Sequence, residues 1–335
     1  RRQRQMCIRD RSMLISIIAI FYNSEPWCRR CIDSILNQKG VELELIAVDD
    51  ASPSDNTLQI LREYELTDSR VRVFFHETNK GISEARNTGL ENVRGDVFYL
   101  IDGDDWLTDE YSLKKLESHW SDGMDWLGGS YEFVDDNGKQ QRCVRFPDIV
   151  CKSKEEIIKN FSSFDFVYTH NRLVNSKFKD IKFRKRIHED RFWNVDAFSR
   201  LNHIGCCSEI TYTYYSRVGS FSGGSIFKKQ FSEDGLQLLT LMTEYGGEWA
   251  SAAKSLAITI LKSCYCSDST KDFRNKIRTG LYEQKILPYE GSLTGYPRFT
   301  QMVYLFVNAG VPDCMIRVFV KCYLFYLFKI RKTTF

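Results

Sequence analysis

Two clusters of carboxylates are the residues of this sequence best placed to do chemistry. Asp49-Asp50 follows the strand predicted over 43–48, and Asp102-Gly103-Asp104-Asp105 follows the strand predicted over 97–101. Carboxylates at the end of a buried strand are costly unless they bind a cation or accept hydrogen bonds. Because Mg²⁺ and Mn²⁺ prefer carboxylate, water and phosphate oxygens, the two clusters together could hold a divalent ion and a nucleotide.

The elements that must position these clusters alternate between strand and helix. Residues 14–21 form a continuous apolar run, as expected of a strand buried on both faces. The alternation predicts an α/β fold with a mostly parallel sheet and helices on both faces, in which ligands bind beyond the carboxyl ends of the strands. Further strands are predicted over 43–48, 71–75 and 97–101, and helices from Pro26 onward, over 56–64 and over 83–91.

The second half of the chain has a mixed pattern. Asn137-Gly138 between two apolar runs predicts a β-hairpin, followed by a helix over 189–201 and a strand over 210–215. From about residue 228 onward the pattern is helical. We therefore expect a leader (1–12), one domain with a nucleotide-binding part (13–107) and an acceptor part (108–225), and a mainly helical C-terminal region (226–335).

The apolar segment 313–330 near the C-terminus carries Arg317 and Lys321 four residues apart. It is at the short limit for a membrane span, and basic residues follow it. This pattern favours an amphipathic helix lying on an anionic membrane surface, and a terminal helix docked on the core is the alternative.

Composition limits the class of protein. Hydrophobic residues at 43% and charged residues at 27% exclude a disordered, collagen-like or polytopic membrane protein. The net charge of +3 stems from residues 1–12, whose five arginines and one aspartate suggest a non-native leader or a short basic targeting arm. The rest is close to neutral, which argues against nucleic-acid binding.

The eleven cysteines are expected to be reduced thiols in a cytoplasmic protein. Leu14–Phe21 runs into polar residues with no cleavage site, so no signal peptide is indicated. In a long chain without a secretion signal, cysteines serve more often as small apolar residues than in disulfides. Cys28 and Cys31 lack a second C-x-x-C pair, which argues against structural zinc.

Five short motifs follow one another along the first hundred residues: 17–23 (IIAIFYN), 31–38 (CIDSILNQ), 48–52 (VDDAS), 79–87 (NKGISEARN) and 99–105 (YLIDGDD). In this order and spacing they resemble the GT-A domain, a Rossmann-like α/β fold, of family-two inverting glycosyltransferases that build bacterial surface polysaccharides. The resemblance is close over 13–107 and looser to about residue 225. Several ordered motifs are more specific than any single one.

The resemblance implies a nucleotide-sugar donor, normally a UDP-sugar, and donor-binding roles for the matching residues. Asp50 would accept a hydrogen bond from the nucleotide base, and Asn23 and Glu25 would lie close to the nucleoside. Arg86 would lie near the nucleotide, and Asp105 would face the donor sugar.

The resemblance also implies a metal site. Asp102-Gly103-Asp104 matches a D-x-D motif, with Asp104 as the main ligand of Mn²⁺ or Mg²⁺ and Asp102 near the ribose and the metal. Such an ion would neutralise the charge that builds on the leaving diphosphate.

Inversion requires a carboxylate that removes a proton from the acceptor hydroxyl. His188-Glu189-Asp190 resembles the family's Glu-Asp element, which makes Asp190 the expected base and Glu189 the second candidate. An acidic helix N-terminus stabilised by the helix dipole is the structural alternative. Arg217, in a Tyr-x-Arg element, would pair with the diphosphate, or else belongs to a basic surface loop. Of the tryptophans, Trp106 is the one placed to stack on a sugar.

The leading hypothesis is transfer of a sugar to a glycan or lipid-linked acceptor by a cytoplasmic enzyme, peripheral at the inner face of a bacterial cell membrane. A metal-dependent nucleotidyltransferase is the second candidate. It would require a phosphate loop rich in glycine and lysine or arginine after the first strand, and Tyr22-Asn23-Ser24-Glu25 supplies no such loop. A catalytically inactive nucleotide- or sugar-binding scaffold is the third candidate. A dinucleotide oxidoreductase is disfavoured because no G-x-G-x-x-G follows a strand.

Overall fold

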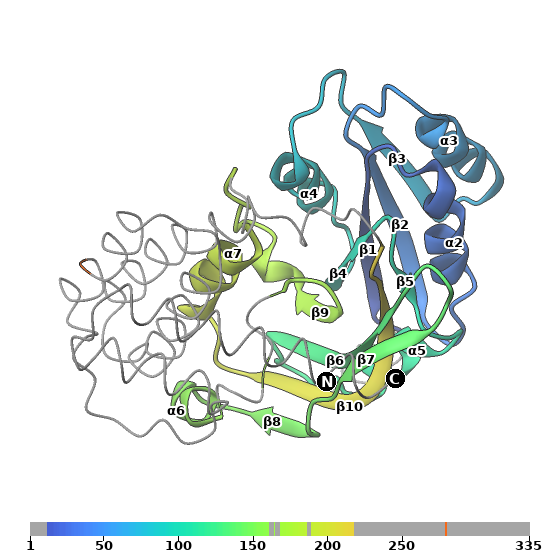
Figure 1. The fold of residues 1–335 in the computed structure, drawn as a ribbon. Helices are drawn as coiled ribbons and strands as arrows, with labels where there is room; N and C mark the ends of the chain where they lie inside the picture. The colour runs from blue at the N-terminus through green and yellow to red at the C-terminus, as the bar shows by residue number, and fades with distance from the viewer. Residues whose placement is uncertain (1–11, 161–163, 165–167, 186–188, 218–278, 280–335) are drawn as a thin grey trace, which may run out of the picture. The chain divides into compact units, whose positions relative to one another are not determined.

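A computed structural model describes residues 12–160, 164, 168–185, 189–217 and 279. Within these residues the chain forms a ten-stranded mixed sheet flanked by helices (Figure 1). The strand order is β3-β2-β1-β4-β9-β6-β10-β5, with β7 paired to β6 and β8 paired to β10. The described residues up to 217 belong to one compact unit.

The first half of the sheet is parallel, as predicted. β1 pairs in parallel with both β2 and β4, and β2 pairs in parallel with β3. Each strand and helix expected before residue 103 is present, with ends that differ by a few residues at most. The elements are β1 (Leu14–Phe21), α2 (Glu25–Leu36), β2 (Glu42–Asp49), α3 (Thr57–Thr67), β3 (Val71–Phe75), α4 (Ile82–Glu91) and β4 (Val97–Asp102).

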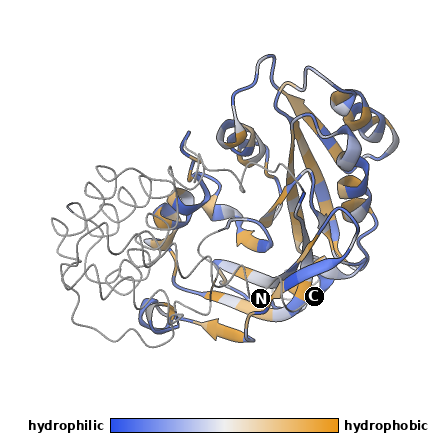
Figure 2. Cartoon of the chain, viewed as in Figure 1, coloured by the Kyte–Doolittle hydropathy of each residue, from blue (hydrophilic) through white to orange (hydrophobic). Residues whose placement is uncertain are grey.

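Both faces of β1 are buried, which explains its unbroken apolar run. On one face, Ile17 and Ala19 join a core cluster with Cys28 and Cys31 of α2. On the other face, Ile18 packs so closely on α4 that a Cβ at Gly89 would lie 2.2 Å from its Cγ2 atom. Figure 1 shows α4 on one side of the strands and α2 and α3 on the other, and Figure 2 shows the strands between them as mainly hydrophobic.

The second half of the sheet departs from parallel pairing. β9 is antiparallel to both β4 and β6, whereas β6 and β10 are parallel. The sheet as a whole is therefore mixed. The elements here are β5 (Trp106–Leu107), α5 (Ser112–His119), β6 (Trp126–Val134), β7 (Gln140–Val144), β8 (Ile149–Cys151), α6 (Lys154–Lys159), β9 (Arg172–Asn175), the 3₁₀ turn η2 (Ser176–Phe178), α7 (Glu189–Phe198) and β10 (Ile204–Tyr215).

The predicted hairpin is confirmed as the antiparallel pair β6–β7. Gly138 in its turn has a φ of 71°, a left-handed conformation that favours glycine. The helix expected over 189–201 is α7, and the strand expected over 210–215 is the end of the longer β10.

Asn171 ties β4 of the first half of the sheet to β6, β9 and β10 of the second half. Its Nδ2 donates to the carbonyls of Gly129 (2.6 Å) and Ser130 (3.0 Å) on β6. Its Oδ1 accepts from the hydroxyls of Tyr99 on β4 (3.1 Å) and Thr211 on β10 (2.7 Å). Asn171 is buried in a left-handed conformation (φ 56°) immediately before β9, so this one side chain fixes where β9 enters the sheet.

The predicted helical C-terminal region, the segment 313–330 and His188 lie outside the described residues. In the described part of the chain, no helix is both long and apolar enough to cross a membrane. The domain boundaries stay predictions.

Candidate active site

The carboxyl ends of β2, β1 and β4 bring the two carboxylate clusters to one edge of the sheet. Val48 of β2 and Asp102 of β4 both lie opposite Ile20 of β1. Just beyond the strands, Asp50 N donates to Phe21 O (2.9 Å) and Gly103 N donates to Ile20 O (3.0 Å). Since neighbouring strands are ~4.8 Å apart, the two clusters are separated by the width of one strand, roughly 10 Å between backbones.

The Asp50 carboxylate shapes the loop that leads into α4. Its Oδ1 lies 2.6 Å from His76 Nδ1 and accepts from Lys80 N (2.9 Å), and its Oδ2 accepts from Gly81 N (2.7 Å). Gly81 has a φ of 90°, so a residue with a side chain would be strained there. Both Asp50 oxygens thus contact the chain itself, and the predicted contact with a nucleotide base stays a prediction.

Asn23 and Glu25 join the loop after β1 to the loop after β2. Asn23 N donates to Ser52 Oγ (2.9 Å), while the Glu25 carboxylate accepts from the backbone and side-chain nitrogens of Asn56 (2.9 and 3.0 Å). The backbone hydrogen bond from Asn56 lowers the pKa of Glu25. Both residues lie at the predicted edge of the sheet, and their contact with a nucleoside is untested.

The turn after β4 requires glycine between its first two acids. A Cβ at Gly103 would lie 2.4 Å from Phe21 Cδ1 and 2.6 Å from Ile20 O. Asp104 follows with a side chain about one-quarter exposed, and its Oδ2 lies 3.2 Å from Arg217 Nε. Burial and the neighbouring Asp102 raise the pKa of Asp104, and Arg217 opposes this effect. Two crowded carboxylates of this kind are stabilised by a cation.

Asp105, by contrast, points into the protein interior. Its carboxylate accepts hydrogen bonds from the Tyr212 hydroxyl and from Tyr215 N (2.8 Å), and the residue is buried. Burial, together with Asp104 and Asp102, raises its pKa well above the usual range. This geometry favours a role for Asp105 in anchoring the end of β10 to the acidic turn. The predicted contact of Asp105 with a donor sugar stays a prediction.

Arg86 connects the donor side of the site to the predicted base. The guanidinium Nη2 lies 3.0 Å from Asp102 Oδ1, and Nη1 lies 2.5 Å from Glu189 Oε1 and 2.6 Å from Asp190 Oδ1. Thr169 Oγ1 donates a further hydrogen bond to Asp190 Oδ1 (2.6 Å). The sequence assigned Arg86 and the Glu-Asp pair to separate roles, whereas the structure brings them into direct contact. Thr169 was missed, because no motif marks it.

Three carboxylates around one guanidinium leave an excess of negative charge. Although burial lowers the pKa of Arg86, its three acidic partners raise that pKa above the ordinary value. Glu189 is the most buried of the three acids (5% exposed). Burial, aided by Asp190 and opposed by Arg86, raises the pKa of Glu189 to about 8.

A cluster of aromatic rings and arginines borders Asp104. The guanidinium carbon of Arg30 lies 3.7 Å from the ring centre of Trp106 and 4.6 Å from that of Tyr215. The guanidinium carbon of Arg217 lies 4.3 Å from the ring centre of Trp27. Arg30 Nη2 also donates to Asp104 O (3.0 Å). The sequence pointed to Trp106 and Arg217, but nothing in it singled out Arg30.

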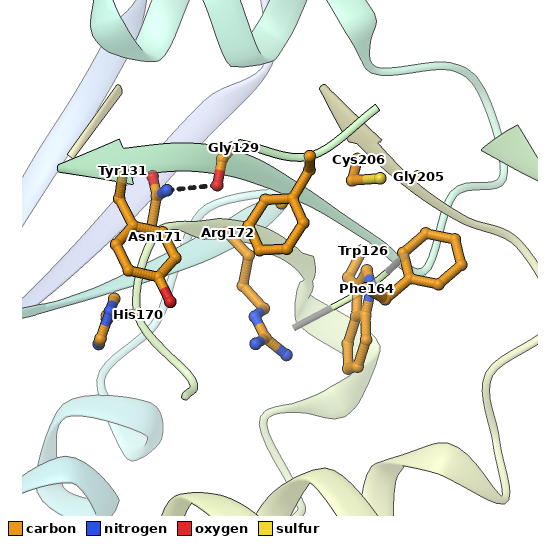
Figure 3. Close-up of a pocket in the computed structure, with 11 residues that line it drawn as sticks. Trp126, Gly129, Tyr131, Phe164, His170, Asn171, Arg172, Gly205 and Cys206 are labelled. Atoms are coloured by element: carbon orange, nitrogen blue, oxygen red, sulfur yellow. Dashed lines mark hydrogen bonds between the residues drawn. The ribbon is translucent and has the colours of Figure 1, made fainter. Parts of the chain in front are cut away.

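A small cavity lies elsewhere, among the strands of the second half (Figure 3). Its lining includes the side chains of Trp126, Tyr131 and Arg172, which are themselves buried, and the Arg172 guanidinium carbon lies 4.4 Å from the Trp126 ring centre. None of the predicted site residues lines it. The candidate active site is therefore the acidic edge of the sheet.

A parallel β3-β2-β1-β4 sheet, an acidic turn after β4 and a mixed second half define a GT-A-type α/β protein. The sequence profile of glycosyl transferase family 2 matches residues 16–189, just over half of the chain, and the chain belongs to this family. The predicted resemblance is confirmed, and the chain is a glycosyltransferase rather than a nucleotidyltransferase.

Relatives and solved structures agree with this assignment. The uncharacterized glycosyltransferase EpsJ of Bacillus subtilis is 29% identical over 293 residues, 79% of this chain and 82% of EpsJ. The putative teichuronic acid biosynthesis glycosyltransferase TuaG of Bacillus subtilis is 38% identical over 105 residues, 31% of this chain and 41% of TuaG. Residues 1–349 of S. aureus TarS, solved with UDP-GlcNAc, share the fold with a TM-score of 0.65 and 21% identity, over 82% of both chains.

Proposed function

We propose that the protein transfers a sugar, with inversion, from a UDP-sugar to a glycan or lipid-linked acceptor in the synthesis of a bacterial surface polysaccharide. The observation that carries this proposal is the contact of one buried arginine with both the D-x-D turn and the Glu-Asp pair. The names of similar proteins support the substrate class: TarS was solved with UDP-GlcNAc, and TuaG is named for teichuronic acid biosynthesis.

Asp102 and Asp104 are the residues that would hold Mn²⁺ or Mg²⁺. Their hard carboxylate oxygens suit either ion, and their crowding is relieved by a cation. In the described part of the chain, no group of three or more His, Cys, Asp or Glu side chains forms a ligand set, so water and the donor diphosphate would complete the coordination. When bound, the ion supplies charge neutralisation for the departing diphosphate.

Asp190 would act as the general base. In the transfer step the acceptor oxygen forms a bond to the anomeric carbon of the donor, and the bond from that carbon to the diphosphate oxygen breaks. The acceptor proton passes to the Asp190 carboxylate, and the electron pair of the broken bond leaves with the nucleoside diphosphate. Attack opposite the leaving group accounts for inversion of configuration.

The protein would work at the inner face of the cell membrane. The sequence 313–330 combines apolar residues with Arg317 and Lys321 and is followed by further basic residues. An amphipathic helix of this composition binds anionic membrane surfaces. Such binding would bring the enzyme to a lipid-linked acceptor.

The test is a screen of nucleotide sugars for release of the nucleoside diphosphate, with and without Mn²⁺, together with calorimetric titration of UDP. We expect Mn²⁺-dependent UDP release from at least one UDP-sugar. Asp104→Ala should abolish release while leaving the thermal midpoint unchanged, and Asp122→Ala, at an exposed turn, is the matched control. Metal-independent UDP binding without any release would instead identify an inactive binding scaffold.

A further inference from the structure

The Asp190 carboxylate is held by one of its two oxygens. Oδ1 accepts from Arg86 Nη1 and from Thr169 Oγ1, each at 2.6 Å. Within the described part of the chain, no residue donates a hydrogen bond to Oδ2, and the side chain is 17% exposed. One oxygen is therefore fixed by the protein, and the other is left for a ligand.

Thr169 belongs to a buried segment that packs against β10 and α7. The residue is 1% exposed, and the next residue, His170, has its ring stacked between Tyr168 and Tyr212, at 4.8 and 4.6 Å between ring centres. Arg172 Nη1 donates to Asn194 Oδ1 (3.0 Å), one turn beyond Asp190 on α7. The Thr169 hydroxyl thus has a fixed position next to the first turn of that helix.

Arg86 donates to the same oxygen from a different element. It lies on α4, which is fastened to the chain before α7: Asn87 Nδ2 donates to Phe183 O (3.0 Å), and Phe183 N donates to Asn87 Oδ1 (2.7 Å). Ser83 Oγ also donates to Arg184 O (2.8 Å). The two donors to Asp190 Oδ1 therefore come from two separately anchored elements.

We propose that Thr169 and Arg86 are positioning residues for the general base, which fix Asp190 through Oδ1 so that Oδ2 meets the acceptor hydroxyl. The proposal rests on the proposed function. Two donors on one oxygen restrain rotation about the Cβ–Cγ bond, which would otherwise turn the second oxygen away from the acceptor hydroxyl. Small misplacements of a reacting group are costly for rate and need not affect substrate binding. Thr169 gives the cleaner test, because Arg86 also touches Asp102.

The experiment compares Thr169→Val, which keeps the shape and removes the hydroxyl donor, with Thr169→Ser, which keeps the donor and removes a methyl group. For each protein, UDP release from the best UDP-sugar of the screen is measured at saturating donor, and the dissociation constant of UDP with Mn²⁺ is measured by calorimetry. We expect turnover to fall about tenfold or more in Thr169→Val with UDP affinity unchanged, since general base catalysis contributes on the order of 10²–10⁴. Thr169→Ser should stay close to the unmodified enzyme.

A double-mutant cycle with Asp190→Asn separates positioning from a structural role. Once the base is removed, Thr169→Val should cause no further loss of turnover, whereas a structural defect would still lower it. Three outcomes would each overturn the proposal. Thr169→Val could turn over as fast as the unmodified enzyme, or Thr169→Val and Thr169→Ser could lose the same amount of turnover. The third is a loss of UDP affinity in Thr169→Val that matches its loss of turnover. If Thr169→Val does not fold, Thr169→Ala and Thr169→Ser form the informative pair. If the unmodified chain neither binds UDP nor releases it, the proposed function itself fails.

Discussion

At the scale of single residues, the ion pair between Arg217 and Asp104 places a cation where a metal ion would compete with it. Arg217 Nε lies 3.2 Å from Asp104 Oδ2, and its guanidinium rests on the Trp27 ring. A metal ion bound at Asp104, as proposed, would weaken this ion pair, and Arg217 would then be free to pair with a diphosphate. The guanidinium would thereby exchange its ion pair with the Asp104 carboxylate for an ion pair with the diphosphate.

Arg217→Gln should therefore bind Mn²⁺ alone more tightly than the unmodified protein, by about threefold, because a partly exposed ion pair is worth ~0.2–1 kcal/mol. The same variant should bind UDP more weakly. Electron paramagnetic resonance of free Mn²⁺ measures the first effect and calorimetry the second. Arg200→Gln, which breaks an exposed ion pair with Asp180, is the control. Unchanged Mn²⁺ affinity in Arg217→Gln would show that the pair does not oppose the ion.

Glu189 should make the stability of the protein depend on pH. Burial raises the pKa of Glu189 from its ordinary value of 4.5 to about 8, so the folded protein holds the proton more tightly than the unfolded chain. The stabilisation is complete below pH 4.5 and is lost as the pH rises through 8.

Glu189→Gln removes this dependence, and its free energy of unfolding relative to the unmodified protein should increase by about 1 kcal/mol or more between pH 6 and pH 8.5. Urea unfolding at the two pH values measures the difference. If the free energies of unfolding of the two proteins changed equally between the two pH values, the prediction would be wrong.

At the scale of elements, the sequence predicted the strands that are long and buried on both faces. β1 and β2 are eight residues each, and buried apolar side chains make up most of both strands. β5 and β9, of two and four residues, were missed, because segments this short carry no period. The place of β9 depends on Asn171, whose four partners are far away in the sequence.

The same limit applies to the site. Asp102, Asp104, Glu189 and Asp190 were predicted as site residues because they occur in motifs, and the predicted end of β4 placed the first two at the edge of the sheet where the structure has them. Their roles stay predictions. Arg86 contacts Asp102, Glu189 and Asp190 because of how α4 and α7 pack. Thr169, which contacts Asp190, lies outside any motif. Long-range packing of this kind leaves no local signal in the sequence.

Asn171→Ala should destabilise the junction of the two halves of the sheet. The change leaves the Tyr99 and Thr211 hydroxyls and the Gly129 and Ser130 carbonyls without their buried partner. Each unsatisfied buried group costs ~1–3 kcal/mol, so a loss of about 2–5 kcal/mol is expected after partial relaxation. Chemical unfolding measures it, with the exposed Asn202→Ala as a control expected to change stability by less than ~0.5 kcal/mol. A loss as small as that of the control would show that the asparagine is replaceable.

At the scale of the whole molecule, the basic and apolar sequence near the C-terminus should direct the full chain to anionic membranes. We expect sedimentation with phosphatidylglycerol vesicles at low salt and not with phosphatidylcholine vesicles. Reversing both charges, with Arg317→Glu and Lys321→Glu, should weaken binding tenfold or more, since each basic residue near such a surface contributes ~1 kcal/mol. Equal sedimentation with both kinds of vesicle, or with neither, would contradict a charge-driven membrane contact.

The strand order also sets the sequence of events during synthesis on the ribosome. β4 can pair on its second side only after β9 has been synthesised. β6 can pair with its parallel neighbour only after β10, which ends at Tyr215, has been synthesised. A nascent chain that has emerged as far as residue 170 therefore carries the acidic turn on a parallel half-sheet in which β4 is still an open edge. Unpaired edges of this kind can pair with other chains, so β4 is most open to incorrect pairing in the interval before β9 emerges.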